Sequence, residues 1–99
     1  MLRLKTKPFF VDVYTTWCGP CKNLDKQTFQ DKELGDYINK NFVNLKWDAE
    51  SELNRPDAMA FDVGLYPTML LLDTNGKLVS RLSGFKSAKE LIEIVSAFT

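Results

Sequence analysis

The chain of 99 residues contains no histidine and only two cysteines, Cys18 and Cys21. A zinc site needs four ligands, usually nitrogen or sulfur, so carboxylates or a second chain would have to complete one here. No apolar run approaches the roughly 18 residues that cross a membrane, and we therefore expect no membrane insertion. The 13 basic residues equal the 13 acidic ones, which leaves no net charge to attract nucleic acid or an anionic membrane surface.

The composition predicts a single domain over residues 1–99. A hydrophobic share of 44% is that of soluble globular proteins, and the length is at the small end for burying a core without cross-links or metal. Residues 1–7 lack the apolar centre of a secretory signal, so the protein is expected to be cytoplasmic or to have lost a leader. Two cysteines in one short motif are not the cysteine-rich framework of a small secreted scaffold.

The residue patterns predict an α/β fold with strands and helices in mixed order. Strands are expected over residues 8–14, 42–48, 67–73 and 77–82, and helices over 19–30, over 32–40, from Pro56 onward and after the capping box at 87–90. The first strand–helix–strand unit makes its two strands parallel, and Asn75–Gly76 predicts a hairpin turn. The result is a mixed sheet of about four strands with helices on both faces.

Both sulfurs lie in the segment Trp17–Cys18–Gly19–Pro20–Cys21, where a helix follows the first strand. Gly19 and Pro20 hold the turn, and proline suits the first turn of a helix. At a helix N-terminus the unpaired N–H groups favour the thiolate of Cys18, which we expect to be exposed and nucleophilic. Cys21, one turn on and deeper, is placed to attack a mixed disulfide. As a structural staple this pair is weak, because a four-residue loop contributes only about 1.9 kcal/mol.

Asp12 is the second candidate catalytic residue. It lies six residues before Cys18 on a strand that we expect to be covered on both sides. An unpaired buried carboxylate is costly, so its pKa should rise and Asp12 becomes a candidate proton acceptor. The alternative is an ordinary strand aspartate that is partly exposed.

The ordered set of motifs resembles the thioredoxin family over most of residues 8–98. The matching features are Val11–Asp12, the Trp-Cys-Gly-Pro-Cys-Lys segment 17–22, Tyr66–Pro67–Thr68 and Gly84. The resemblance implies the thioredoxin fold, here with its N-terminal strand and helix shortened or absent, because Leu2 and Leu4 could form at most a short strand. It also implies that Asp12 assists deprotonation of Cys21. The family often has a lysine on the neighbouring strand, where this alignment places Asn44.

The resemblance also implies a substrate groove around Cys18. A proline that opens a strand is usually trans, but in the family the Tyr66–Pro67 bond is cis, and the proline packs beside the disulfide. Trp17, Tyr66, Pro67 and Gly84 are therefore the expected substrate-binding residues, with Phe85 as a further candidate for an extended polypeptide. Trp47 is assigned to the core.

The predicted function is reduction of protein disulfides through Cys18–Cys21 exchange, by a monomer with no bound cofactor. The partners would be disulfide-containing proteins and a reductase or membrane electron donor. Residues 28–31, 73–76 and 84–85 resemble bacterial extracytoplasmic domains such as the C-terminal domain of DsbD, which favours the cell envelope over the cytoplasm. The alternative is a non-enzymatic thioredoxin-fold binding or scaffold module in which the cysteines are idle.

Overall fold

The computed structural model describes residues 7–98, so the expectation for Leu2 and Leu4 lies outside the described residues. The elements follow the predicted order, with η1 denoting a short 3₁₀ helix. They are β1 (Phe9–Tyr14), α1 (Gly19–Lys26), η1 (Thr28–Gln30), α2 (Lys32–Asn41), β2 (Val43–Asp48), α3 (Arg55–Ala60), β3 (Thr68–Leu72), β4 (Leu78–Ser83) and α4 (Ala88–Phe98).

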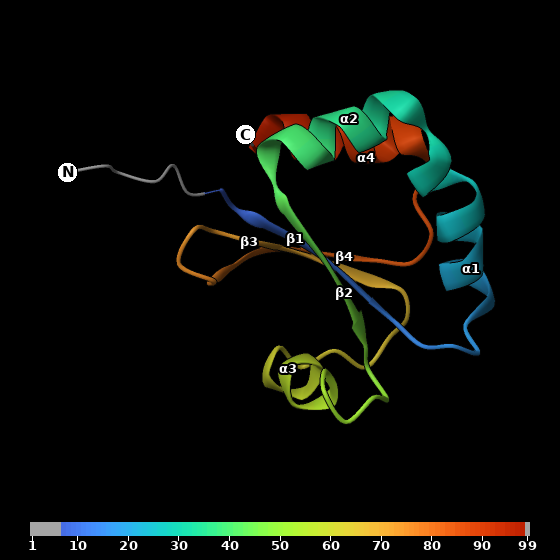
Figure 1. The fold of residues 1–99 in the computed structure, drawn as a ribbon, viewed down its shortest axis with the longest axis vertical. Coiled ribbons are helices and arrows are strands. Elements are labelled where there is room, and N and C mark those ends of the chain that lie inside the picture. Colours follow the sequence, from blue (N-terminus) through green and yellow to red (C-terminus); the bar gives the residue numbers. More distant parts are fainter. Residues whose placement is uncertain (1–6, 99) are drawn as a thin grey trace.

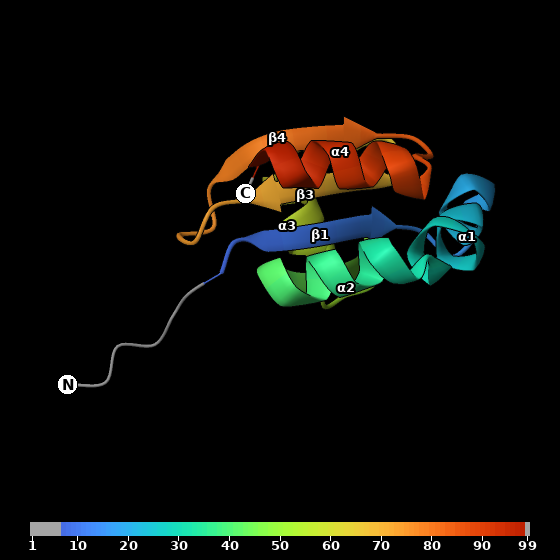
Figure 2. The same cartoon turned by 90° about the horizontal axis from the view of Figure 1, so that it is seen from above.

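The strands form one sheet in the order β2-β1-β3-β4. β1 pairs in parallel with β2, whereas the β1–β3 and β3–β4 pairs are antiparallel. Figure 1 shows α2 and α4 side by side on one face of this sheet and α3 on the other. In the view from above, the chain leaves the carboxyl end of the central strand β1 and enters α1, so the cysteine motif lies at the end of a central strand (Figure 2).

Two apolar clusters hold the layers together, and consecutive residues of β1 contribute to opposite ones. Phe10 packs with residues of α1, α2 and α4, whereas Val11 and Val13 pack on the α3 side. Every residue of β3 is buried, as expected for a central strand covered on both faces. The predicted mixed α/β sheet with helices on both faces is confirmed.

The helix predicted over 19–30 is too long, because the structure breaks it after Lys26. Gln27 is the C-cap residue of α1, with a φ of −114°, and the hydroxyl of buried Thr28 donates a 2.6 Å hydrogen bond to the carbonyl of Lys86. This bond ties the segment to the chain just before α4. Asp31 then starts α2 by accepting a hydrogen bond from the N–H of Leu34 at 2.9 Å, as its predicted capping role requires.

Candidate active site

Cys18 and Cys21 form a disulfide at the N-terminus of α1, with their Cα atoms 5.2 Å apart. Cys18 is the N-cap residue, and its Sγ accepts a 3.1 Å hydrogen bond from the backbone N–H of Cys21. Pro20 occupies the first turn, where its missing N–H costs no helical hydrogen bond. The donor and the helix dipole both favour negative charge on the Cys18 sulfur once the disulfide is reduced.

The expectation that Cys18 is exposed and Cys21 deeper is wrong for the oxidised protein. Each residue is only 3% exposed. Two bonded sulfurs cover each other, and the N–H of Cys18 also bonds back to the carbonyl of Thr15 at 3.4 Å. A reductant therefore meets a recessed disulfide, and burial alone does not tell the attacking cysteine from the resolving one. The N-cap position of Cys18 does distinguish them.

Asp12 lies in the middle of β1 and is 4% exposed, which rules out the alternative of a partly exposed strand residue. Its Oδ1 is buried without a hydrogen-bond partner, and its Oδ2 lies 3.4 Å from the ammonium of Lys46. Burial raises the pKa of Asp12 from 3.8 to about 6, and Lys46 only partly opposes this rise. The carboxylate can thus take up a proton near neutral pH.

Asn44, which the alignment places at the position of the family's lysine, is not the residue opposite Asp12 in the structure. In the parallel register of β1 and β2, Asp12 lies opposite Lys46, whereas Asn44 lies opposite Phe10. The Asn44 side chain donates to the carbonyl of Ile38 at 3.1 Å, where α2 ends. A lysine, Lys46, therefore does stand beside the Asp12 carboxylate.

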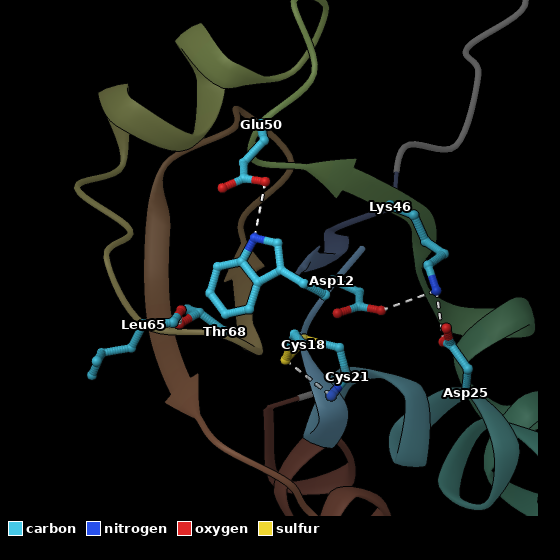
Figure 3. Close-up of a disulfide and its surroundings, with 9 residues drawn as sticks. Asp12, Cys18, Cys21, Asp25, Lys46, Glu50, Leu65 and Thr68 are labelled. Atoms are coloured by element: carbon cyan, nitrogen blue, oxygen red, sulfur yellow. Dashed lines mark hydrogen bonds and ion pairs between the residues drawn. A yellow bond between two sulfur atoms is a disulfide. The ribbon is translucent and has the colours of Figure 1, made fainter. Parts of the chain in front are cut away.

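Lys46 lies between two carboxylates, as Figure 3 shows. Its Nζ is 2.6 Å from Asp25 of α1 and 3.4 Å from Asp12, and it lies 4.9 Å from the centre of the Tyr14 ring. Burial disfavours the charged lysine, but the hydrogen bond to Asp25 and the two negative charges outweigh it, so the pKa of Lys46 is raised. Lys46 stays cationic while Asp12 titrates.

Pro67 and Gly84 lie close together at the end of the sheet where β1 ends. Thr68 pairs with Val13 in the antiparallel register, so the residues just before β3 lie beside the end of β1. The Tyr66–Pro67 bond is cis, as expected, and the carbonyl of Pro67 accepts a 2.9 Å hydrogen bond from the N–H of Gly84. Gly84 has a φ of +84°, a conformation that favours glycine.

Trp17 and Tyr66 meet edge to face, with ring centroids 6.1 Å apart. The indole N–H of Trp17 donates a 3.0 Å hydrogen bond to Glu50, which follows β2. The indole remains 63% exposed and Phe85 is 40% exposed. The structure thus joins Trp17 to Tyr66 and Pro67 to Gly84, whereas Phe85 lines a separate pocket with Gln27, Thr28 and Ser87.

Comparison with known protein families gives a match over the whole chain. A family model described as a thioredoxin-like domain matches residues 1–99. The chain belongs to this family. It is 35% identical over 91 residues to the chloroplastic F-type thioredoxin of Mesembryanthemum crystallinum, a match that covers 92% of this chain and 44% of that protein.

Two further relatives of this thioredoxin-like chain carry names from disulfide chemistry. The thiol:disulfide interchange protein DsbD of Campylobacter jejuni is 29% identical over 93 residues, covering 93% of this chain and 16% of that protein. The solution structure of a putative disulphide-isomerase from Bacteroides thetaiotaomicron is 44% identical, with a TM-score of 0.77, over 90% of this chain and 74% of the other. The chain thus spans less than half the length of these two curated relatives, the thioredoxin and DsbD.

Three residues of the site escaped the sequence analysis, namely Lys46, Asp25 and Glu50. Counting equal steps from the starts of β1 and β2 would have found Lys46, because Phe9 lies opposite Val43. Asp25 and Glu50 carry no local signal, since each acts only through a side chain more than 20 positions away.

Among residues 7–98, no helix is long and apolar enough to cross a membrane.

Proposed function

We propose that this thioredoxin-like domain is a thiol–disulfide oxidoreductase that reduces protein disulfides. The observation that carries the proposal is the Cys18–Cys21 disulfide at the start of α1, in which the Cys18 sulfur accepts the Cys21 N–H. A purely structural bond would gain nothing from this placement, whereas a reversible one needs a stabilised thiolate.

In the proposed reaction the Cys18 thiolate attacks one sulfur of a substrate disulfide and expels the other as a thiolate. This step forms a mixed disulfide between Cys18 and the substrate. Asp12 then accepts the proton of the Cys21 thiol, and the Cys21 thiolate attacks the Cys18 sulfur. The substrate leaves with two thiolates, which take protons from solvent, and the enzyme holds the Cys18–Cys21 disulfide, so two electrons have passed to the substrate.

The proposed substrate is an extended polypeptide lying beside the disulfide. Trp17 and Leu65 are 63% and 69% exposed; Trp17 packs against Tyr66, and Leu65 directly precedes Tyr66 in the chain. Exposed apolar side chains of this size are typical of recognition surfaces. We assign Trp17, Tyr66, Pro67 and Gly84 to this groove, with the backbone near Tyr66 pairing with the substrate as an added strand.

The cysteine pair itself carries the electrons in its dithiol form, so the proposed reaction uses no bound cofactor. A reductase or a membrane electron donor would restore the dithiol. The likeness to DsbD supports a place in the bacterial cell envelope, and we propose that the domain acts as a monomer.

The test is reduction of insulin disulfides by the wild type and two single variants. Cys18→Ser should abolish turnover because it removes the nucleophile, whereas Cys21→Ser should accumulate a mixed disulfide with the substrate. Wild-type turnover by Cys18→Ser would refute the proposal. If the parent shows no redox turnover, and a double-serine variant captures the same partner as the parent, the chain is instead a scaffold module.

A further inference from the structure

A pocket of about 360 Å³ opens beside Asp12, and the proposed reaction does not account for it. It lies between β2 and the helices α1 and α2. Apolar side chains form part of its wall, and Asp12, Asp25, Asn39, Asn44 and Lys46 supply polar groups. A space of this size with several polar partners holds water. The pocket therefore brings solvent to a carboxylate that is otherwise buried.

The two oxygens of Asp12 have different surroundings. Oδ1 is buried and has no hydrogen-bond partner, whereas Oδ2 lies 3.4 Å from Nζ of Lys46, which also lines the pocket. Figure 3 shows the Asp12 carboxylate directed toward Lys46, with Lys46 reaching on to Asp25. Oδ2 is thus the oxygen on the pocket side.

The pocket and the substrate groove have no residue in common. Trp17, Tyr66, Pro67 and Gly84 are all absent from the pocket lining. A polypeptide docked in the groove would cover the disulfide and shut out solvent on that side. The proton taken from Cys21 reaches Asp12 while the groove is still covered, and the pocket is then the side of Asp12 that stays open to solvent.

We propose that this pocket is the route by which Asp12 exchanges its proton with solvent while substrate occupies the groove. The inference rests on the proposed function. The Cys21 thiol gives its proton to ionised Asp12, water in the pocket takes that proton from Oδ2, and Asp12 returns to the carboxylate. No electron moves in this step.

The charged and titratable groups around Asp12 come from two elements. Lys46 faces it from β2, and α1 supplies Asp25 together with the two cysteines. From β3 the residue opposite Asp12 is Met69, which carries no charge. Lys46 has a raised pKa and stays protonated, whereas burial raises the pKa of Asp12 to about 6.

Gly35 offers a way to close the pocket without touching the cysteines. It lies on α2 and lines the pocket, and a Cβ added there meets nothing within 4 Å. Gly35→Leu should place an apolar side chain in the pocket and displace water. Gly35→Ala is the matched control, because it gives the same relief of helix entropy with only one methyl group. Asn39→Leu fills the pocket from another position.

The experiment mixes each reduced protein with excess 5,5′-dithiobis(2-nitrobenzoate) in a stopped-flow instrument between pH 5 and 9. Attack by Cys18 releases one nitrothiobenzoate, and resolution by Cys21 releases the second in a phase whose rate does not depend on reagent concentration. Loss of water should raise the pKa of Asp12. A rise of about one unit lowers the second phase about five-fold at pH 6 in Gly35→Leu and leaves it unchanged at pH 9, where Asp12 is ionised in both.

The outcomes separate this inference from the function on which it rests. The inference holds if Gly35→Leu and Asn39→Leu move the acid limb of the second phase to higher pH and Gly35→Ala does not. It is overturned if both filled variants keep the wild-type limb while Asp12→Asn slows the second phase. Absence of a second phase in the wild type would instead refute the oxidoreductase function itself.

Discussion

The two faces of β1 are equally buried but differ in what they can do. Val11 and Val13, on the α3 side, are 0% exposed and lie among apolar neighbours. On the other face Phe10 is 2% exposed and Asp12 is 4% exposed, and the pocket next to Asp12 carries Lys46 and Asp25. Burial is therefore common to both faces, whereas reactivity follows from one carboxylate with a cation and solvent at its side.

This difference depends on strand geometry. Side chains alternate between faces, so a shift of one residue in the register of β1 would put Asp12 into the apolar cluster on the α3 side and leave its charge without a partner. The apolar face resists such a shift because Val11 and Val13 would then have to leave their cluster. The packing of Val11 and Val13 thus fixes the register that places Asp12 beside Lys46.

The largest expected effect is a loss of stability on the α3 face. Leu70 is 0% exposed and pairs with Val11, so Leu70→Ala should lower the free energy of unfolding by about 4 kcal/mol through lost burial and a cavity. The pH below which resolution by Cys21 slows should not change, because Asp12 keeps its surroundings. Urea unfolding checks the first part, and a cost below about 1 kcal/mol would show that this face is loosely packed.

The next effect is a gain of stability on the reactive face. The pKa of Asp12 is about 6 in the folded protein and 3.8 as its ordinary value, so the folded state binds more protons between these values. Its contribution to stability is therefore present below about pH 4 and lost as the pH rises through 6. Asp12→Asn removes this titration, and at pH 8 the variant should be more stable by about 3 kcal/mol.

Urea unfolding of the wild type and Asp12→Asn at pH 4 and pH 8 measures this difference. Other titrating groups cancel in the comparison, because both proteins carry them. Equal differences at the two pH values would mean that Asp12 is not desolvated in solution.

A smaller effect is expected at the cation. Lys46→Met removes the positive charge near Asp12, so the pKa of Asp12 should rise further, by about one unit. Asn44→Ala is the matched control on the same strand, since Asn44 lies opposite Phe10 and not opposite Asp12. A carboxyl-carbon NMR titration follows Asp12 in each protein. A shift of the Asp12 pKa in Asn44→Ala, with no shift in Lys46→Met, would show that Asn44 and not Lys46 is the partner of Asp12.

The smallest effect is expected far from both faces of β1. Lys32 and Asp36 form a 2.7 Å ion pair on α2, about as short as the Lys46–Asp25 pair, but their side chains are 89% and 68% exposed. Solvent screens such a pair, so Lys32→Ala should leave both the unfolding midpoint and the Asp12 titration unchanged. A movement of the Asp12 titration would show that charge on α2 reaches the pocket.

Local patterns predicted the order of strands and helices and the Ser87–Glu90 capping box, which the structure confirms with hydrogen bonds of 3.1 and 3.2 Å. They also placed Asp12, Cys18 and Cys21 at the site, because these residues share one strand–helix junction. The break of the first helix could not be predicted, since it depends on the bond from Thr28 to a carbonyl 58 residues away.

The amino-acid sequence by itself determined the fold class, the cysteine pair and the buried carboxylate, because each follows from residue types a few positions apart. Only the tertiary structure decided that Lys46 is the neighbour of Asp12, that Cys18 is recessed when oxidised, and that a pocket opens beside the carboxylate. The physical reason is that strand register and pocket shape depend on contacts between distant segments. Such contacts minimise buried, unpaired surface over the whole chain, and no local stretch records them.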